Sequence, residues 1–169
     1  MKPDFETLYE AYYDKIYQYA YSILFNRENA EDVVSDTFFA AYAAYDRYDP
    51  DIASPATWLT RIAHNKAIDF VKSPAYRRRE SLDKLSDESS FEVGTPDNMI
   101  EMTEQAEKND IILRLYAKLT KAEREFLNLR YVMELTDAEI AALYNLQVKT
   151  INKRYQRLLA RCRKLLDKK

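Results

Sequence analysis

The sequence contains a single glycine, Gly94, in 169 residues. Hairpin turns and nucleotide-binding loops need residues that adopt positive φ at little cost, and glycine is their main supplier. The scarcity of glycine therefore excludes all-β folds, dinucleotide-binding folds and P-loops. With 47% apolar and 32% charged residues, the chain is predicted to be a globular all-α protein.

The first half of the chain shows three segments in which apolar residues recur at steps of three and four, the spacing of an amphipathic helix. These segments span residues 4–25, 30–45 and 55–72. Ser54 is predicted to cap the third helix, with Pro55 at its first position, and Pro74 is predicted to end it. Three helices of this length are enough for a small domain with its own core.

Aromatic residues are concentrated in this first half, where nine of the fourteen tyrosines fall between Tyr9 and Tyr48. One interpretation is that they fill the core, since aromatic rings bury a large apolar area. The other is that some stay exposed for a partner, because aromatic residues are enriched at interfaces. Trp58 is expected in the core rather than as a stacking surface for bases.

Helical periodicity is lost between Glu80 and Glu107, where nine acidic residues stand against one lysine. Serine, proline and Gly94 lie between them, a composition typical of linkers. We therefore divide the chain into a first domain (1–79), a flexible acidic linker (80–104) and a second domain (105–169). The linker is either a solvated tether or an acidic strand that mimics nucleic acid inside a basic channel.

Two capping boxes mark helix starts in the second domain, one at residues 120–123 and one at residues 136–139. The second box opens a short helix, which is followed by a tight turn at Asn145 and a longer helix from about Val148 to the end. This order is the outline of a helix-turn-helix. Asparagine suits the turn because it adopts the left-handed conformation readily.

The net charge of −2 hides an uneven distribution. Residues 1–71 hold six basic and twelve acidic residues, whereas residues 146–169 hold nine basic residues and one acidic residue. The basic segment is the helix that a helix-turn-helix places in the major groove, so we expect its first turns to face DNA. A second basic cluster closes the first domain and consists of Lys72, Arg77, Arg78 and Arg79.

The sequence gives no sign of a catalytic or metal centre. Cys162 and His64, each the only residue of its type, cannot build a zinc site together, and no nucleophile–base pair or carboxylate pair is apparent. We therefore expect no enzyme activity, no cofactor, no metal and no small-molecule substrate. Because no apolar run is long enough to span a membrane, we expect a cytoplasmic protein without membrane insertion.

Four segments, in order along the chain, resemble motifs of bacterial sigma factors of the extracytoplasmic-function (ECF) branch. Residues 30–39 (AEDVVSDTFF) resemble the AED-x-x-Q-x-x-F motif, and residues 57–69 (TWLTRIAHNKAID) resemble WL-x-x-I-A-x-N-x-x-x-D. Residues 119–126 (LTKAEREF) resemble the start of the family's second domain, and residues 135–157 resemble its helix-turn-helix without a gap. The resemblance implies that the two domains correspond to sigma regions 2 and 4.

The resemblance also implies one docking surface for core RNA polymerase and two surfaces that read promoter DNA. The core-binding candidates are Asp32, Ser35, Asp36, Phe38 and Phe39. The −10 element would be contacted by Arg61, His64, Asn65 and Lys66, with Arg77, Arg78 and Arg79 on the DNA backbone. The −35 element would be contacted by Lys149, Thr150, Asn152, Lys153, Arg154 and Arg157.

Core RNA polymerase, promoter DNA and an anti-sigma factor are the partners that the resemblance implies. Four positions depart from the family pattern: Ser35 stands where glutamine is usual, Asn145 and Lys149 where glycine is usual, and Asn152 where lysine is usual. The preferred bases therefore do not follow from the resemblance. A different interpretation of the same motifs is a dimeric helix-turn-helix regulator that binds an operator without acting as a polymerase subunit.

Overall fold

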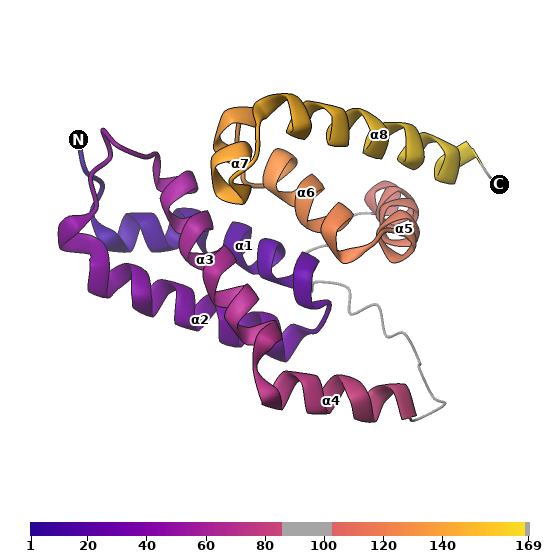
Figure 1. The fold of residues 1–169 in the computed structure, drawn as a ribbon, viewed down its shortest axis with the longest axis horizontal. Helices are drawn as coiled ribbons and strands as arrows, with labels where there is room; N and C mark the ends of the chain where they lie inside the picture. Colours follow the sequence, from indigo (N-terminus) through magenta and orange to yellow (C-terminus); the bar gives the residue numbers. More distant parts are fainter. Residues whose placement is uncertain (86–102, 168–169) are drawn as a thin grey trace.

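The computed structural model describes residues 1–85 and 103–167, which fold into helices joined by short loops (Figure 1). These ranges contain eight α-helices, one short 3-10 helix and no strand, so the all-α prediction is confirmed. Most of the predicted linker lies outside the described residues. The elements are α1 (Phe5–Leu24), α2 (Arg27–Ala44), η1 (Tyr45–Arg47), α3 (Pro55–Lys72), α4 (Pro74–Leu85), α5 (Thr103–Lys118), α6 (Lys121–Tyr131), α7 (Asp137–Tyr144) and α8 (Val148–Asp167).

Helix α4 was not predicted, because Pro74 was interpreted only as a stop signal. Pro74 does follow the end of α3, with Ser73 in an extended conformation, but it is also the first residue of α4. The Ser73 hydroxyl oxygen accepts a hydrogen bond of 3.2 Å from the Tyr76 N–H and so caps the new helix. Proline is well suited to a first helical position, where no N–H is needed. Helical structure thus continues to Leu85, past the predicted domain boundary at residue 79.

The N-terminal unit, which we define as α1–α4, is built around the mutual packing of α1, α2 and α3. Tyr19, Ile16 and Leu59 are completely buried in its core. Ser54 accepts a hydrogen bond of 3.2 Å from the Thr57 N–H at the start of α3, which confirms the predicted N-cap. The capped start fixes where α3 begins and therefore which of its faces meets the core.

The C-terminal unit, which we define as α5–α8, places both α5 and α7 against α8. Both predicted capping boxes are present, at the starts of α6 and α7. Asn145 follows α7 in the left-handed conformation, with φ 53° and ψ 47°, as its position in the turn predicted. Ile151 and Leu158 are buried and attach α8 to the rest of the unit.

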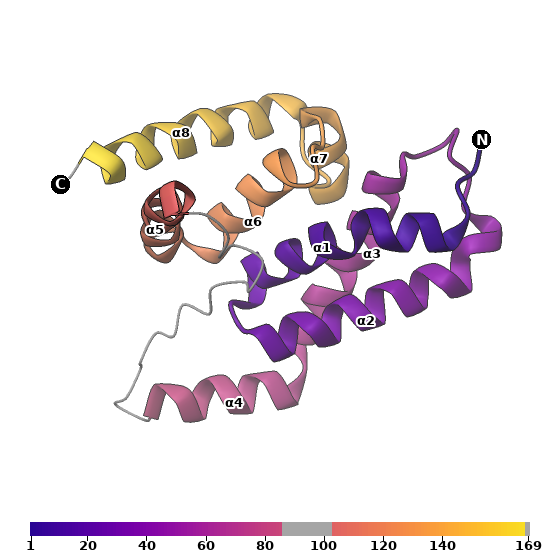
Figure 2. The ribbon, with the colours of Figure 1, turned by 180° about the vertical axis from the view of Figure 1, so that it is seen from behind.

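The two units contact each other, chiefly through α1 and α6, which lie side by side in the opposite views of Figures 1 and 2. Arg124 of α6 is buried at this contact, and its Nε donates to the Ser22 carbonyl oxygen of α1 over 3.1 Å. Its guanidinium also lies 4.5 Å from the centre of the Phe25 ring. A cation at the carboxyl end of α1 is favourable because the last carbonyls of a helix carry partial negative charge.

Candidate DNA and polymerase interfaces

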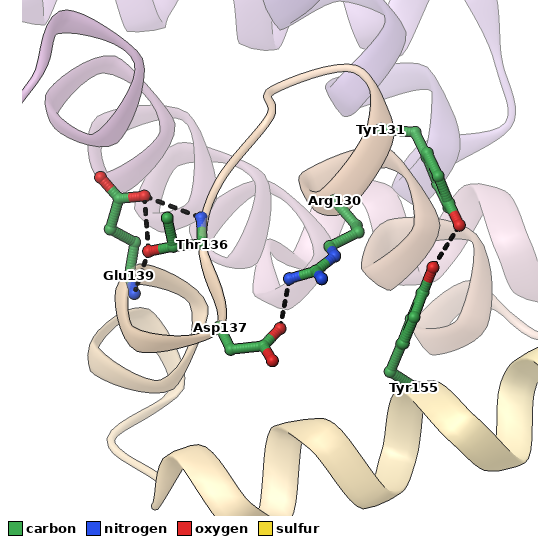
Figure 3. Close-up of polar contacts among 6 residues, drawn as sticks. All are labelled: Arg130, Tyr131, Thr136, Asp137, Glu139 and Tyr155. Atoms are coloured by element: carbon green, nitrogen blue, oxygen red, sulfur yellow. Dashed lines mark hydrogen bonds and ion pairs between the residues drawn. The ribbon is translucent and has the colours of Figure 1, made fainter.

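The helix-turn-helix is held by a polar frame that starts at the second capping box (Figure 3). The Thr136 N–H donates to Glu139 Oε2 over 2.8 Å, and the Glu139 N–H donates to Thr136 Oγ1 over 3.3 Å. After α7, the Leu146 N–H donates to the Ala141 carbonyl oxygen over 2.8 Å, which closes the turn. Both ends of α7 are therefore fixed by hydrogen bonds before α8 begins.

A second group of side chains ties α8 to α6 and α7. Arg130 of α6 forms an ion pair with Asp137 of α7, and its guanidinium lies 4.9 Å from the centre of the Tyr155 ring of α8 (Figure 3). The Tyr131 and Tyr155 hydroxyls also share a hydrogen bond. Sequence reasoning missed this group, since pairs that join different helices leave no periodic signal along the chain.

The candidates for the −35 element lie on the outer side of α8. Lys149, Asn152, Lys153, Arg154 and Arg157 are exposed, and Thr150 is half-buried. This placement leaves the basic side chains of the first turns of α8 exposed to solvent.

Two residues of α8 outside the candidate set, Val148 at its start and Arg161 near its end, differ in how they contact the rest of the unit. Val148 is 48% exposed because it stands at the first position of α8, beside the turn. Arg161 was counted with the basic residues of the helix, but it donates to Glu123 Oε1 over 2.8 Å and to the Lys118 carbonyl oxygen over 3.2 Å. Arg161 thus helps to join α8 to the segment where α5 ends and α6 begins.

The candidates for the −10 element are divided between an exposed face and a buried position. Arg61 and Asn65 are exposed one turn apart on α3, and Lys66 is half-buried. Arg77, Arg78 and Arg79 are exposed on α4. His64 is different, because only 8% of it is exposed.

His64 is buried by a hydrogen-bonded cluster that joins the two units. The Glu125 Oε1 atom of α6 lies 2.9 Å from His64 Nδ1 and accepts a hydrogen bond of 2.8 Å from the Tyr19 hydroxyl of α1. The Tyr19 hydroxyl also lies 2.8 Å from His64 Nδ1, so the polar atoms of the three side chains all contact one another. The Tyr144 ring of α7 packs at right angles to the His64 ring, with centres 5.4 Å apart.

The ionisation of the two tyrosines follows from this environment. Burial raises the pKa of Tyr19 well above its usual value, and the Glu125 carboxylate adds to the rise. Burial also raises the pKa of Tyr144, again with a contribution from Glu125. Both phenols therefore stay protonated and remain hydrogen-bond donors around the buried carboxylate.

The core-binding candidates lie along the outer side of α2, with one exception. Asp32, Ser35 and Asp36 are exposed, and Phe39 is 80% exposed. Phe38 is only 5% exposed and packs against other aromatic rings of its unit, so its side chain supports the helix from inside.

The tyrosines divide between the two interpretations that the sequence left open. Tyr19 and Tyr48 are buried, as core filling predicts, whereas Tyr42 of α2 is 68% exposed beside the core-binding candidates. Trp58 is half-buried and stacks on Tyr48, with ring centres 4.2 Å apart. Tyr42 was not singled out from the sequence, because the helical pattern alone does not separate exposed from buried rings in so aromatic a segment.

The described residues contain no group of three or more His, Cys, Asp or Glu side chains placed to hold a metal ion. Among the helices in the same ranges, none has both the length and the apolar character needed to cross a membrane.

Comparison with protein families gives two matches that follow the two units. Residues 8–83 match Sigma-70 region 2, and residues 109–162 match Sigma-70, region 4. The ECF RNA polymerase sigma factor SigW of Bacillus subtilis is 30% identical over 157 residues, which cover 90% of this chain and 83% of SigW. The ECF RNA polymerase sigma factor BldN of Streptomyces coelicolor is 29% identical over 160 residues, which cover 93% of this chain but 59% of BldN.

Two solved structures share the arrangement of helices. CnrH, a sigma factor of Cupriavidus metallidurans, was solved in complex with the cytosolic domain of CnrY. Its sequence is 29% identical to this chain, and the match covers 96% of this chain and 87% of CnrH with a TM-score of 0.60. The sigma factor RpoE of Bartonella quintana, solved with the anti-sigma factor NepR, is 22% identical and matches over 98% of each chain with a TM-score of 0.65. The second structure supports the fold.

Two helical units, the second with a basic helix-turn-helix, define a DNA-binding transcription protein. The chain belongs to the ECF sigma factors of bacterial RNA polymerase. It is a subunit that directs core RNA polymerase to specific promoters and initiates transcription. The alternative of a dimeric regulator that acts without polymerase is not supported by these matches.

Proposed function

We propose that the three exposed surfaces divide the work of promoter recognition among them. The outer face of α2 docks on core polymerase, α3 and α4 contact the −10 element, and α8 contacts the −35 element. The observation that carries this proposal is the placement of the candidate residues on separate elements, with exposed acidic and aromatic side chains on α2 and exposed basic ones on α8. Basic side chains suit the phosphate backbone of DNA, whereas an aromatic face suits a protein partner.

The division corresponds to sigma region 2 in residues 1–79 and sigma region 4 in residues 105–169, joined by the acidic segment 80–104. In this role the chain has no catalytic step of its own; it works in the cytoplasm, where core polymerase and the chromosome are found. No small-molecule substrate or cofactor takes part.

An anti-sigma factor is the further partner that we propose. CnrH was solved with the cytosolic domain of CnrY, and RpoE with the anti-sigma factor NepR. A related partner of this chain would cover the surfaces proposed above for polymerase and DNA, and would thereby prevent binding to core polymerase.

Binding to core polymerase tests the docking surface most simply. The double variant Asp36→Lys/Phe39→Ala reverses one charge and removes one exposed ring, so we expect at least about a tenfold loss of affinity in a fluorescence titration, as for other interface anchors. Glu28→Lys/Ala40→Ser is the control on the same helix, because Glu28 is exposed outside the candidate set and Ala40 is only half-buried. An equal loss in both variants would contradict the assignment of α2. Failure of the unaltered chain to produce transcripts with core polymerase would contradict the sigma assignment itself.

A further inference from the structure

The first residues of the chain lie against η1 and the loop that leads into α3, and both views of the ribbon show the N-terminus beside this loop (Figures 1 and 2). Lys2 Nζ donates to the carbonyl oxygens of Tyr45 and Asp46, the latter over 3.5 Å. Its charge also lies over two rings, 4.2 Å from the centre of Tyr45 and 5.9 Å from the centre of Tyr48. The Tyr45 hydroxyl donates to the Pro3 carbonyl oxygen. We call Lys2, Pro3 and Tyr45 the N-terminal clasp.

Tyr48 connects the N-terminal clasp to α3 and to the loop of residues 49–54, which precedes this helix. Tyr48 is buried, and its hydroxyl donates to the Ala53 carbonyl oxygen over 3.1 Å, which joins the two ends of the loop. Its ring stacks on Trp58 of α3. The position of Tyr48 therefore determines both where the loop ends and how the loop meets α3.

The loop 49–54 has a defined turn of its own and an exposed apolar side chain. The Ile52 and Ala53 N–H groups donate to the Asp49 carbonyl oxygen over 3.2 and 3.3 Å, and the Asp51 N–H donates to Asp49 Oδ1 over 2.9 Å. Ile52 is 83% exposed on this turn. The loop thus holds one conformation and presents an apolar group to solvent.

The loop borders the surface that we assign to the −10 element. Arg61 stands about 9 Å along the axis of α3 from Pro55, the residue that follows the loop. The exposed carboxylates of Asp49 and Asp51 repel phosphates, so the loop is suited to bases rather than to the DNA backbone. Apolar side chains contact the thymine methyl group, and carboxylates accept from the cytosine amino group. Any contact that this loop makes with DNA therefore depends on the sequence of the DNA.

We propose that Lys2 is a positioning residue for base selection: the N-terminal clasp fixes the loop 49–54 through Tyr48, and the fixed loop discriminates among the bases of the −10 element. This inference rests on the assignment of α3 to the −10 element. A binding site on a loop discriminates well only when neighbouring residues hold the loop in one geometry. Because Lys2 lies outside the loop, its substitution changes this geometry and leaves every residue of the loop and of α3 in place.

Lys2→Leu in the full-length protein is the decisive variant, because it removes the cation and its donors and keeps an apolar stem. Lys2→Arg is the conservative variant, which retains a cation with donors. Lys15→Leu is the matched control, since Lys15 Nζ also lies over a tyrosine ring, 5.7 Å from the centre of Tyr12, and forms its ion pair with Glu134. Core polymerase with each variant would transcribe a promoter that the unaltered protein selects, and versions of it in which each base pair of the −10 and −35 elements is replaced in turn.

A wrong base pair in a DNA site ordinarily lowers affinity about fivefold or more. We expect Lys2→Leu to reduce this discrimination below about twofold at one or more −10 positions, and to leave discrimination at the −35 element unchanged. Lys2→Arg and Lys15→Leu should retain both. A merely structural role of Lys2 would instead lower transcription from all templates alike. Amide hydrogen exchange gives a second measurement, in which the Ile52 and Ala53 amides should exchange faster in Lys2→Leu than in the unaltered protein.

Full −10 discrimination by Lys2→Leu, or an equal loss in Lys2→Leu and Lys15→Leu, would overturn the proposal. If Lys2→Leu loses helical circular dichroism, Tyr45→Phe decides instead, because it removes only the hydroxyl that binds Pro3. Arg61→Ala, measured in parallel, separates this inference from the proposed function. Relaxation of the −10 element by Arg61→Ala alone would contradict only the role of the N-terminal clasp, whereas relaxation by neither variant would contradict the assignment of α3 as well.

Discussion

Helices α3 and α8 are both assigned to promoter DNA, yet the structure presents them in opposite ways. Five of the six candidates on α8 are exposed and the sixth is half-buried, whereas on α3 the exposed Arg61 and Asn65 flank a buried His64. The cause is the neighbour of each helix. The outer side of α8 faces solvent, but the side of α3 that carries His64 lies against α6 and α7. A motif thus fixes which residues a helix carries, while the packing of the other unit decides which of them are accessible.

Two variants that each remove a single hydroxyl test this comparison, one in the buried cluster around His64 and one in the tyrosine pair that α8 forms with α6. Tyr19→Phe leaves the buried Glu125 with one donor fewer, so we expect a loss of about 1–3 kcal/mol in the free energy of unfolding. Tyr155→Phe removes a hydroxyl whose partner, Tyr131, is exposed and can bind water, so we expect a loss below about 0.5 kcal/mol.

Urea denaturation measures both losses, with far-ultraviolet circular dichroism as the common signal. The fluorescence of Trp58, the only tryptophan, reports on α3 in the same samples. Losses of similar size in the two variants would mean that the contact between the units contributes no more than the exposed tyrosine pair.

A smaller effect is expected from acid, at the contact between Glu139 and Thr57. Burial by itself would raise the pKa of the Glu139 carboxyl, but hydrogen bonds from Thr57 and Thr136 outweigh it and hold the pKa below its usual value of 4.5. A carboxyl with a lower pKa in the folded chain stabilises the fold above its unfolded pKa, and this contribution is lost as pH falls through the folded pKa.

Glu139→Gln should therefore lose less stability than the unaltered protein between about pH 5 and pH 3, as measured by the urea midpoint. Glutamine keeps the capping box, so the helix start is preserved. Glu134→Gln serves as the control for the removal of an exposed carboxylate. The same acid-induced loss in Glu139→Gln and in the unaltered protein would show that this carboxyl does not contribute.

Much of the fold was predictable because its signals are local. Helix starts at Ser54, Thr120 and Thr136, and the turn at Asn145, each depend on the chemistry of a few consecutive residues. The local signal at Pro74 gave an incomplete prediction, because a proline that ends one helix can also begin the next. Only the hydrogen bond that caps the new helix at Ser73 shows that a second helix starts here.

The site was predictable in its residues but not in their exposure. His64 and Glu125 are 61 positions apart, and no local pattern connects them. Phe38 and Phe39 are adjacent in the same motif, but their directions around the helix axis bury one and expose the other. The contact between the units arises from α1 and α6 packing together, which depends on the whole chain.

Promoter selection tests the assignment of two helices to two DNA elements most directly. The chain and core polymerase would transcribe templates with a randomised promoter region, and the templates that yield transcripts would be sequenced for the unaltered protein, for Arg61→Ala and for Arg154→Ala. We expect the unaltered protein to select two separate elements, Arg154→Ala to relax only the upstream −35 element and Arg61→Ala only the −10 element. Selection of a single element, or relaxation of the same element by both variants, would contradict the division between α3 and α8.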